Sequence, residues 1–92
     1  MILSFRHKGL QKFFETGKPS GIPAQQARRI GHILAVLHTS NDPLGMNLPG
    51  FRLHPLKGDR KGEWAVSVTG NRRIVFEFLG DNAINVDFVD YH

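Results

Sequence analysis

The chain has 92 residues and no cysteine, and its 12 Lys and Arg outnumber its 8 Asp and Glu, which gives a formal net charge of +4. This length predicts one domain that covers residues 1–92. The absence of cysteine excludes disulfides, thiolate zinc sites and cysteine nucleophiles. No apolar run is long enough to span a membrane, and the N-terminus does not resemble a signal peptide, so a cytoplasmic protein is expected.

The N-terminal half predicts a short strand followed by two helices. Residues 2–5 are the strand candidate, and residues 7–15 carry apolar side chains at helical spacing before Gly17 and Pro19 end the helix. His7 is expected to cap this helix or to lie on its surface. The second helix is expected to start near residues 20–23 and to run to about His38, because apolar residues recur at helical intervals at Ala27, Ile30, Leu34 and Leu37. A turn-rich linker follows.

The C-terminal half predicts an antiparallel meander of three strands with apolar residues at alternate positions. The three apolar rows are Trp64, Val66 and Val68, then Ile74, Phe76 and Phe78, and finally Ile84, Val86 and Phe88. A one-residue slip would turn a whole row to solvent, so three-residue loops are expected at 70–72 and 80–82. In this register Arg73 and Tyr91 share the opposite face of the sheet. Asp90 and His92 have core parity, so they must lie beyond the packed core or after a bulge.

The basic residues gather in one stretch of the chain. Residues 52–73 hold six Lys and Arg against two Asp and Glu, a balance of +4 that equals the charge of the whole chain. Such a concentration is typical of a surface that binds a polyanion, although a solvated charged face would give the same pattern. Within it, residues 54–60 combine an imidazole with cations in a loop shaped by Pro55 and Gly58.

Other chemistries find little support in the sequence. The glycines at 58 and 62 do not have the spacing of a phosphate-cradling loop, so nucleotide hydrolysis is not expected. His32 and His38 are six residues apart, which does not place two ligands on one helix face, so no metal or other cofactor is expected. The chain ends instead with an acid, a phenol and an imidazole, directly after the last predicted strand. Imidazole titrates near neutrality, which suits proton transfer.

These motifs together resemble the HigB toxins, which belong to the RelE superfamily of type II toxin–antitoxin systems. The resemblance is carried by His-Pro-Leu-Lys-Gly-Asp-Arg at 54–60, by Trp64, by Arg73 within Arg-Ile-Val-Phe, and by the terminal Asp-Tyr-His, and it runs over the whole chain. It implies an α+β, RelE-like fold with two N-terminal helices packed on a twisted, mainly antiparallel sheet. This agrees with the element order expected above. It also implies a ribosome-dependent endoribonuclease that cuts messenger RNA in the decoding site and needs no metal.

The resemblance implies catalytic roles for His54, Lys57, Arg73, Asp90, Tyr91 and His92. The RNA supplies its own 2′-hydroxyl nucleophile, so the protein must take that proton, stabilise the phosphorane and protonate the leaving 5′-oxygen. The two imidazoles suit proton transfer, without a choice of which is base and which is acid. The lysine suits the phosphorane as a point charge, and Arg73 as a planar fork. Asp90 would orient an imidazole, and Tyr91 would stack on a base or bond the phosphate.

Structural roles are the alternatives for several of these residues. His54 could close a turn before Pro55, the cations could be solvated charges, and Tyr91 could be a packing residue. Asp90 could pair with Arg72, its cross-strand neighbour in the expected register, as a surface ion pair worth at most about 1 kcal/mol. That pairing would leave catalysis to the histidines.

The implied partners are a HigA-like helix-turn-helix antitoxin, the 70S ribosome and messenger RNA. Arg52, Arg60, Lys61 and Arg72 are expected to contact RNA or the ribosome, and for Arg60 and Lys61 an acidic antitoxin is the alternative. The competing function is that of a ParE-like inhibitor of DNA gyrase, which shares the scaffold without a nuclease site. The two imidazoles with Lys57 and Arg73 favour the nuclease. A plain RNA-binding module is less favoured, because the phenylalanines mostly fit the apolar rows.

Overall fold

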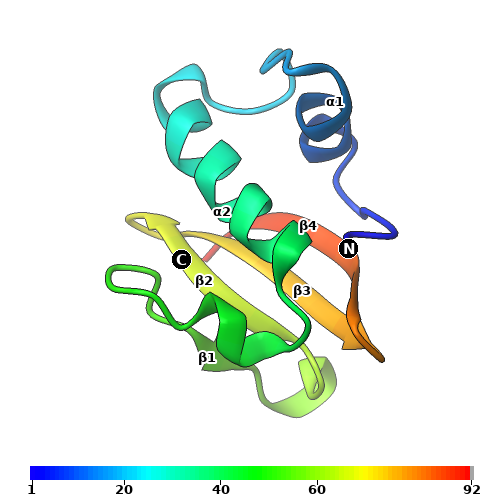
Figure 1. Cartoon of the computed structure of the whole chain (residues 1–92). Helices are drawn as coiled ribbons and strands as arrows, with labels where there is room; N and C mark the ends of the chain where they lie inside the picture. Colours follow the sequence, from blue (N-terminus) through cyan, green and yellow to red (C-terminus); the bar gives the residue numbers. More distant parts are fainter. Residues whose placement is uncertain (92) are drawn as a thin grey trace.

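In the computed structural model, which describes residues 1–91, two helices cover one face of a four-stranded antiparallel sheet (Figure 1). The helices are α1 (Lys8–Thr16) and α2 (Ala27–Thr39). The strands are β1 (His54–Pro55), β2 (Trp64–Thr69), β3 (Arg72–Leu79) and β4 (Asn82–Asp90), arranged in the order β1-β2-β3-β4. Short 3-10 turns are η1 (Ala24–Gln26), η2 (Pro43–Met46) and η3 (Gly58–Arg60). This confirms the expected α+β architecture. Neither helix is long and apolar enough to cross a membrane.

The N-terminal segment differs from the expected strand. It joins the sheet through two isolated parallel bridges, Ile2 to Ala83 and Phe5 to Val86, and does not form a continuous ladder. His7 caps α1, which was one of the two roles expected for it. Its Nδ1 accepts a hydrogen bond from the backbone N–H of Leu10 at 3.1 Å. The start of the second helix was predicted too early. Residues 24–26 form a 3-10 turn, and the regular α-helix begins after it.

Both hairpin loops are shorter than predicted, because β-bulges supply the residues that the loops were expected to hold. The loops contain only residues 70–71 and 80–81, with Thr69 paired to Arg72 and Leu79 paired to Asn82. Register shifts follow at residue 68 of β2 and near Asn85 of β4, whose φ is 54°. The bulge at residue 68 keeps Val66 opposite Ile74, so the first two apolar rows do share a face.

The prediction for the third apolar row was wrong at one position, Ile84. The pairing of Phe78 with Ala83 and of Glu77 with Ile84 turns Ala83 to the helices and Ile84 to the other face. Ala83 is fully buried, whereas Ile84 is only partly buried. A two-residue loop moves the start of β4 by one residue, and the bulge at Asn85 returns Val86 and Phe88 to the core face.

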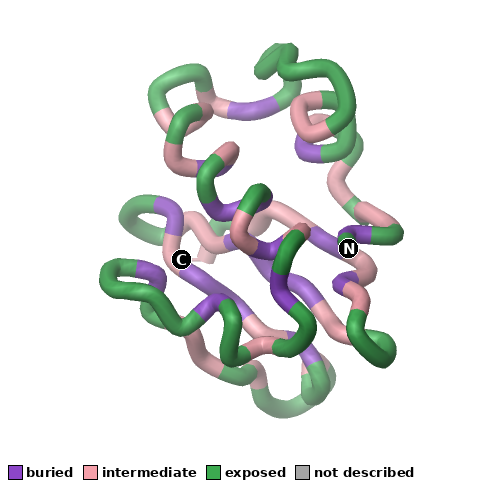
Figure 2. The backbone as a smooth tube through the Cα atoms, in the orientation of Figure 1, coloured by how far each residue is buried: buried purple, intermediate pink, exposed green. Residues whose placement is uncertain are grey.

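The core lies between the helices and the sheet (Figure 2). Its fully buried side chains come from both layers and include Leu10, Ile30, Leu37, Ile74 and Phe76. The sheet also buries residues on its other face, since Ala65 and Val75 have no exposed surface although they alternate with core residues. The face away from the helices is therefore covered in part by its own side chains and loops.

The first turn of α1 approaches the chain that leads to α2 without space for a side chain. A Cβ on Gly9 would lie 2.3 Å from the carbonyl oxygen of Gly21, whereas a Cβ on Gly31, in the middle of α2, would meet only the Phe13 ring at 3.5 Å. We expect Gly9→Ala to lower the free energy of unfolding by about 1–3 kcal/mol through overpacking. Gly31→Ala is the control, and should raise it by up to about 1 kcal/mol because alanine favours helix. Urea denaturation of both variants measures this, and an equal response at the two sites would contradict the close approach.

Candidate active site

Strand pairing brings three of the predicted site residues onto the face of the sheet that the helices leave open. His54 pairs with Ala65, which pairs with Val75, and Arg73 occupies the next position of β3 on the same face. Tyr91 comes directly after the end of β4, two residues beyond Val89, the partner of Arg73, and its phenol lies within electrostatic range of Arg60, as does Asp87 of this face. The expectation that Arg73 and Tyr91 share a face is thus confirmed. β1 and β3 are separated by two strand spacings, about 10 Å, which leaves room for a phosphate group between their side chains.

The ring of His54 is oriented by the backbone next to it. Its Nδ1 lies 2.9 Å from the carbonyl oxygen of Arg52. A carbonyl oxygen can only accept a hydrogen bond, so Nδ1 carries the proton and donates it. In the neutral ring the Nε2 lone pair is then free to accept a proton. Arg52 itself has a φ of 53°, a left-handed conformation that is uncommon for a residue with a side chain.

The Arg60 side chain reaches this face from η3, the turn between β1 and β2. Its Nε and a terminal nitrogen donate to the two carboxylate oxygens of Glu63 at 3.0 and 3.1 Å. This hydrogen bond is the main cause that raises the pKa of the Arg60 guanidinium, and the charges of Tyr91 and Asp87 act in the same direction. The guanidinium therefore stays charged and lies close enough to Tyr91 and Asp87 to feel their fields.

A second set of polar residues on this face escaped the sequence reasoning. Arg6 contacts Glu63 at 3.5 Å and Glu77 at 3.6 Å, and the side-chain amide of Asn85 donates to Glu77 at 2.9 Å. Glu63 is only 7% exposed. The available signal was the position of Glu63 and Glu77 in the sequence, since both alternate with core residues of β2 and β3 and so had to point away from the helices.

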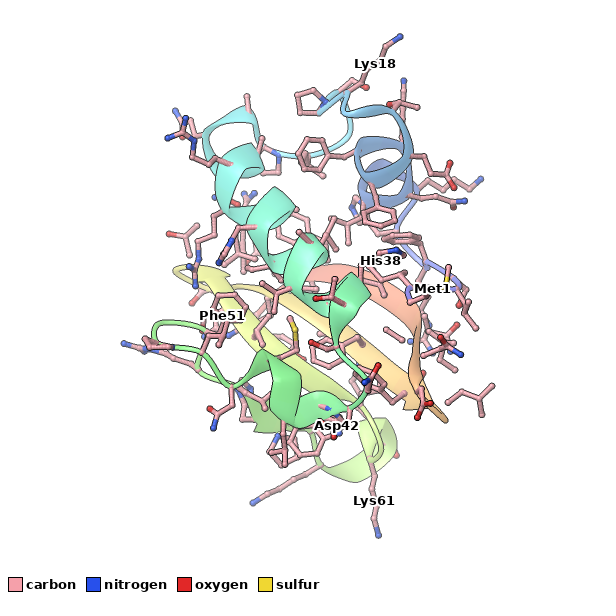
Figure 3. The ribbon with its side chains drawn as sticks, in the orientation of Figure 1. Met1, Lys18, His38, Asp42, Phe51 and Lys61 are labelled. Carbon is pink, nitrogen blue, oxygen red and sulfur yellow. The ribbon has the colours of Figure 1, made fainter. Side chains whose placement is uncertain are left out.

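The remaining cations divide into two groups. Arg52, Lys57 and Lys61 are exposed, and Figure 3 shows Lys61 extending away from the body of the protein. Arg73 is held differently: one terminal nitrogen donates to the carbonyl oxygens of Gly70 at 2.6 Å and of Arg72 at 3.0 Å. Within residues 1–91 no carboxylate forms an ion pair with Arg73, so its charge is available for an anion.

The C-terminal triplet is divided between the two faces of the sheet. Asp90 pairs with Arg72 across the strands, and the carboxylate lies 4.0 Å from the guanidinium, as the ion-pair alternative predicted. Arg72 also lies over the Phe88 ring, so this pair sits at the end of the core face. Tyr91 follows on the open face, and its backbone N–H donates to the carbonyl oxygen of Asn71 at 2.8 Å. His92 lies outside the described residues.

The site is an open surface in the part of the chain that the structure describes. Residues 1–91 enclose no pocket, and they contain no group of three or more His, Asp or Glu side chains arranged to hold a metal ion. Within residues 1–91, this face offers the imidazole of His54 with its unprotonated nitrogen, several cations and a phenol. Such groups can bind a phosphodiester along an extended chain and transfer a proton to or from it.

Comparison with known structures identifies the fold. The YoeB/ParE toxin from Agrobacterium tumefaciens matches with a TM-score of 0.59 at 20% identity, over 100% of this chain and 99% of that one. The protein thus has the RelE-like toxin fold. A family model described as a RelE-like toxin of type II toxin–antitoxin system HigB matches residues 3–92, and the chain belongs to this family.

Two relatives are similar over nearly their whole length. The Endoribonuclease HigB of Proteus vulgaris is 45% identical over 92 residues, which is 100% of both chains. The Toxin HigB-1 of Vibrio cholerae serotype O1 is 28% identical over 94 residues, covering 100% of this chain and 98% of that protein. The resemblance inferred from the motifs at 54–60 and 90–92 is confirmed by these matches.

We expect Glu63 to hold the polar network on the open face together. Glu63→Gln removes the charge that both Arg60 and Arg6 contact, and should lower the free energy of unfolding by about 1–2 kcal/mol, since both guanidiniums are partly solvated. Asp59→Asn removes one carboxylate charge at an exposed position of the same segment and is the matched control. Urea denaturation at neutral pH measures both variants. Equal stability of the two would show that the Glu63 contacts contribute nothing to the fold.

Proposed function

We propose that this protein is a ribosome-dependent endoribonuclease, the toxin of a type II toxin–antitoxin pair. In this proposal it enters the ribosomal A site in the cytoplasm, cleaves messenger RNA there without a metal, and so stops translation. Its partners are then the 70S ribosome, messenger RNA and a HigA-like helix-turn-helix antitoxin. The proposal is supported by membership of the HigB-like family and by the 45% identity to a relative named as an endoribonuclease.

The observation that carries the proposal is the His54 ring with its free Nε2, on the same open face as Arg73 and Tyr91. Nε2 would take the proton of the RNA 2′-hydroxyl as its oxygen attacks the neighbouring phosphorus. The P–O5′ bond then breaks, which leaves a 2′,3′-cyclic phosphate and a 5′-hydroxyl. In this assignment His54 is the base, and His92 is the acid that protonates the leaving 5′-oxygen.

The cations would stabilise the negative charge that the phosphorane gains. Arg73 is the first candidate, because backbone carbonyls orient its guanidinium and no carboxylate in residues 1–91 neutralises it. Lys57 would add a point charge from the loop before η3. Arg60, which is paired with Glu63, would contact RNA phosphates outside the scissile bond, and so would Arg52 and Lys61. Tyr91 would stack on a base or bond a phosphate oxygen.

The alternative is inhibition of DNA gyrase on the same scaffold. One solved structure that shares the fold is named a YoeB/ParE toxin, but at 20% identity it shows the fold alone. A protein that only binds gyrase has no need for an imidazole on the same face as a guanidinium that forms no ion pair within residues 1–91. The arrangement of His54 and Arg73 therefore favours the nuclease.

Cleavage should depend on the ribosome and on His54. We expect wild-type protein to cut a defined messenger RNA bound to 70S ribosomes, and His54→Ala to lose about 10²–10⁴ in rate because general base catalysis is removed. Primer extension at equal folded concentration measures the cuts, with Lys12→Ala on the exposed side of α1 as the control. If wild-type protein leaves the RNA intact but blocks supercoiling by gyrase, the gyrase function replaces the nuclease.

The pH dependence should separate base from acid. Because the base must be neutral and the acid protonated, single-turnover cleavage should follow a bell-shaped pH profile. The rate falls at low pH when the base takes up a proton, so His54→Ala should flatten the acidic limb. It falls at high pH when the acid loses its proton, so His92→Ala should flatten the alkaline limb. If the two variants flatten the opposite limbs, the roles of the two residues are reversed.

A further inference from the structure

Arg29 is a residue of α2 whose guanidinium donates hydrogen bonds to backbone carbonyl oxygens. Its Nε donates to the carbonyl oxygen of Val68 at 2.9 Å, and a terminal nitrogen donates to those of Gly50 and Ser67, both at 2.8 Å. The guanidinium lies over the Phe51 ring, with its carbon 5.5 Å from the ring centre. Within residues 1–91 it makes no ion pair. It therefore joins the helix layer to two chain segments that meet at one end of β2.

The first of these segments leads directly to His54. Gly50 has a φ of 84° and Arg52 a φ of 53°, so the chain turns through two left-handed residues on either side of Phe51. The carbonyl of Phe51 accepts the N–H of Ser67 at 2.7 Å, which ties this turn to β2. Figure 3 shows Phe51 beside α2, where its ring also meets the His32 ring edge-on. A non-glycine residue keeps a left-handed conformation only when its surroundings fix it.

The second segment is the bulge of β2. The register of β2 against β3 shifts at Val68, which lies between Ser67 and Thr69. A bulged residue is left out of the regular ladder. The Val68 carbonyl receives a hydrogen bond from Arg29. Ser67, the other carbonyl of this strand that Arg29 binds, is the cross-strand partner of Arg73.

We propose that Arg29 is a positioning residue for His54. It fixes Gly50 and Ser67, which hold the left-handed turn at Arg52, and the carbonyl of Arg52 then accepts the hydrogen bond that His54 Nδ1–H donates at 2.9 Å. Through these contacts a residue of α2 keeps the proton of the neutral His54 ring on Nδ1. Nε2 is therefore left unprotonated. The consequence for catalysis rests on the proposed function, whereas the consequence for the imidazole does not.

The imidazole can be observed without any RNA. Long-range proton–nitrogen spectra of the histidine rings distinguish a proton on Nδ1 from one on Nε2, and His54→Gln identifies the signal. We expect the Nδ1–H form in wild-type protein near the alkaline end of its stable range. Arg29→Ala should convert His54 to a mixture dominated by the Nε2–H form, while the other histidine signals stay in place. Arg28→Ala, which removes the neighbouring exposed cation, is the matched control and should change nothing.

Cleavage on the ribosome then tests the catalytic consequence. We expect Arg29→Ala to lower kcat about tenfold or more with little change in KM, because the defect lies in proton transfer. Arg29→Lys should recover part of this loss, since an ammonium can reach one of the carbonyls. In a His54→Ala background, Arg29→Ala should cause no further loss, as expected for residues that act as one unit.

The possible results separate the two proposals. If Arg29→Ala leaves the His54 tautomer unchanged, or if its rate loss only follows the unfolded fraction, Arg29 is structural and the inference is wrong. If Arg29→Ala does not fold, the same spectra are recorded on Arg29→Lys. This variant makes fewer hydrogen bonds to the carbonyls but still fills the space of the Arg29 side chain. If the tautomer changes as expected but wild-type protein does not cleave RNA, the positioning of the imidazole stands and the nuclease function fails.

Discussion

The alternation of side chains along β3 is the constraint on which the rest of the structure depends. Ile74 and Phe76 point to the helices and are fully buried, whereas Arg73, Val75 and Glu77 point to the open face. One central strand thus supplies the core and the candidate site at the same time. A shift of one residue would place Arg73 in the core and Ile74 on the surface, so the register that stabilises the fold is also the register that builds the site.

The register is maintained by bulges and not by the length of the turns. Sequence patterns predicted correctly that the rows at Val66 and Ile74 share a face, because burial of alternate apolar residues demands it. They predicted the wrong loops, since the parity argument cannot distinguish an odd loop from an even loop followed by a bulge. Asn85 was the missed signal, because asparagine is one of the few residues that tolerate its φ of 54°. The error at Ile84 follows from this bulge together with the two-residue loop that precedes β4.

The site was predictable to the extent that it consists of sequence motifs. The loop at 54–60 and the shared face of Arg73 and Tyr91 follow from motif and parity. The place of Arg60 does not, because it depends on a fold of the chain around η3 that brings its guanidinium to Glu63. The role of Arg29 could not be predicted from the sequence for a similar reason. Its partners are carbonyl oxygens of residues more than 20 positions away, and backbone groups leave no pattern in a sequence.

One two-residue turn contacts both Arg73 and Tyr91 of the open face. The β2–β3 turn at 70–71 gives the Gly70 carbonyl to the Arg73 guanidinium and the Asn71 carbonyl to the Tyr91 backbone. A guanidinium held by carbonyls keeps its full charge, whereas one held by a carboxylate, such as that of Arg60, presents a largely neutralised pair to an approaching phosphate. The open face therefore contains two kinds of arginine. Arg60 is stabilised by Glu63 and helps to build the surface, whereas Arg73 is oriented by carbonyls and forms no ion pair within residues 1–91, as the proposed stabilisation of a phosphorane requires.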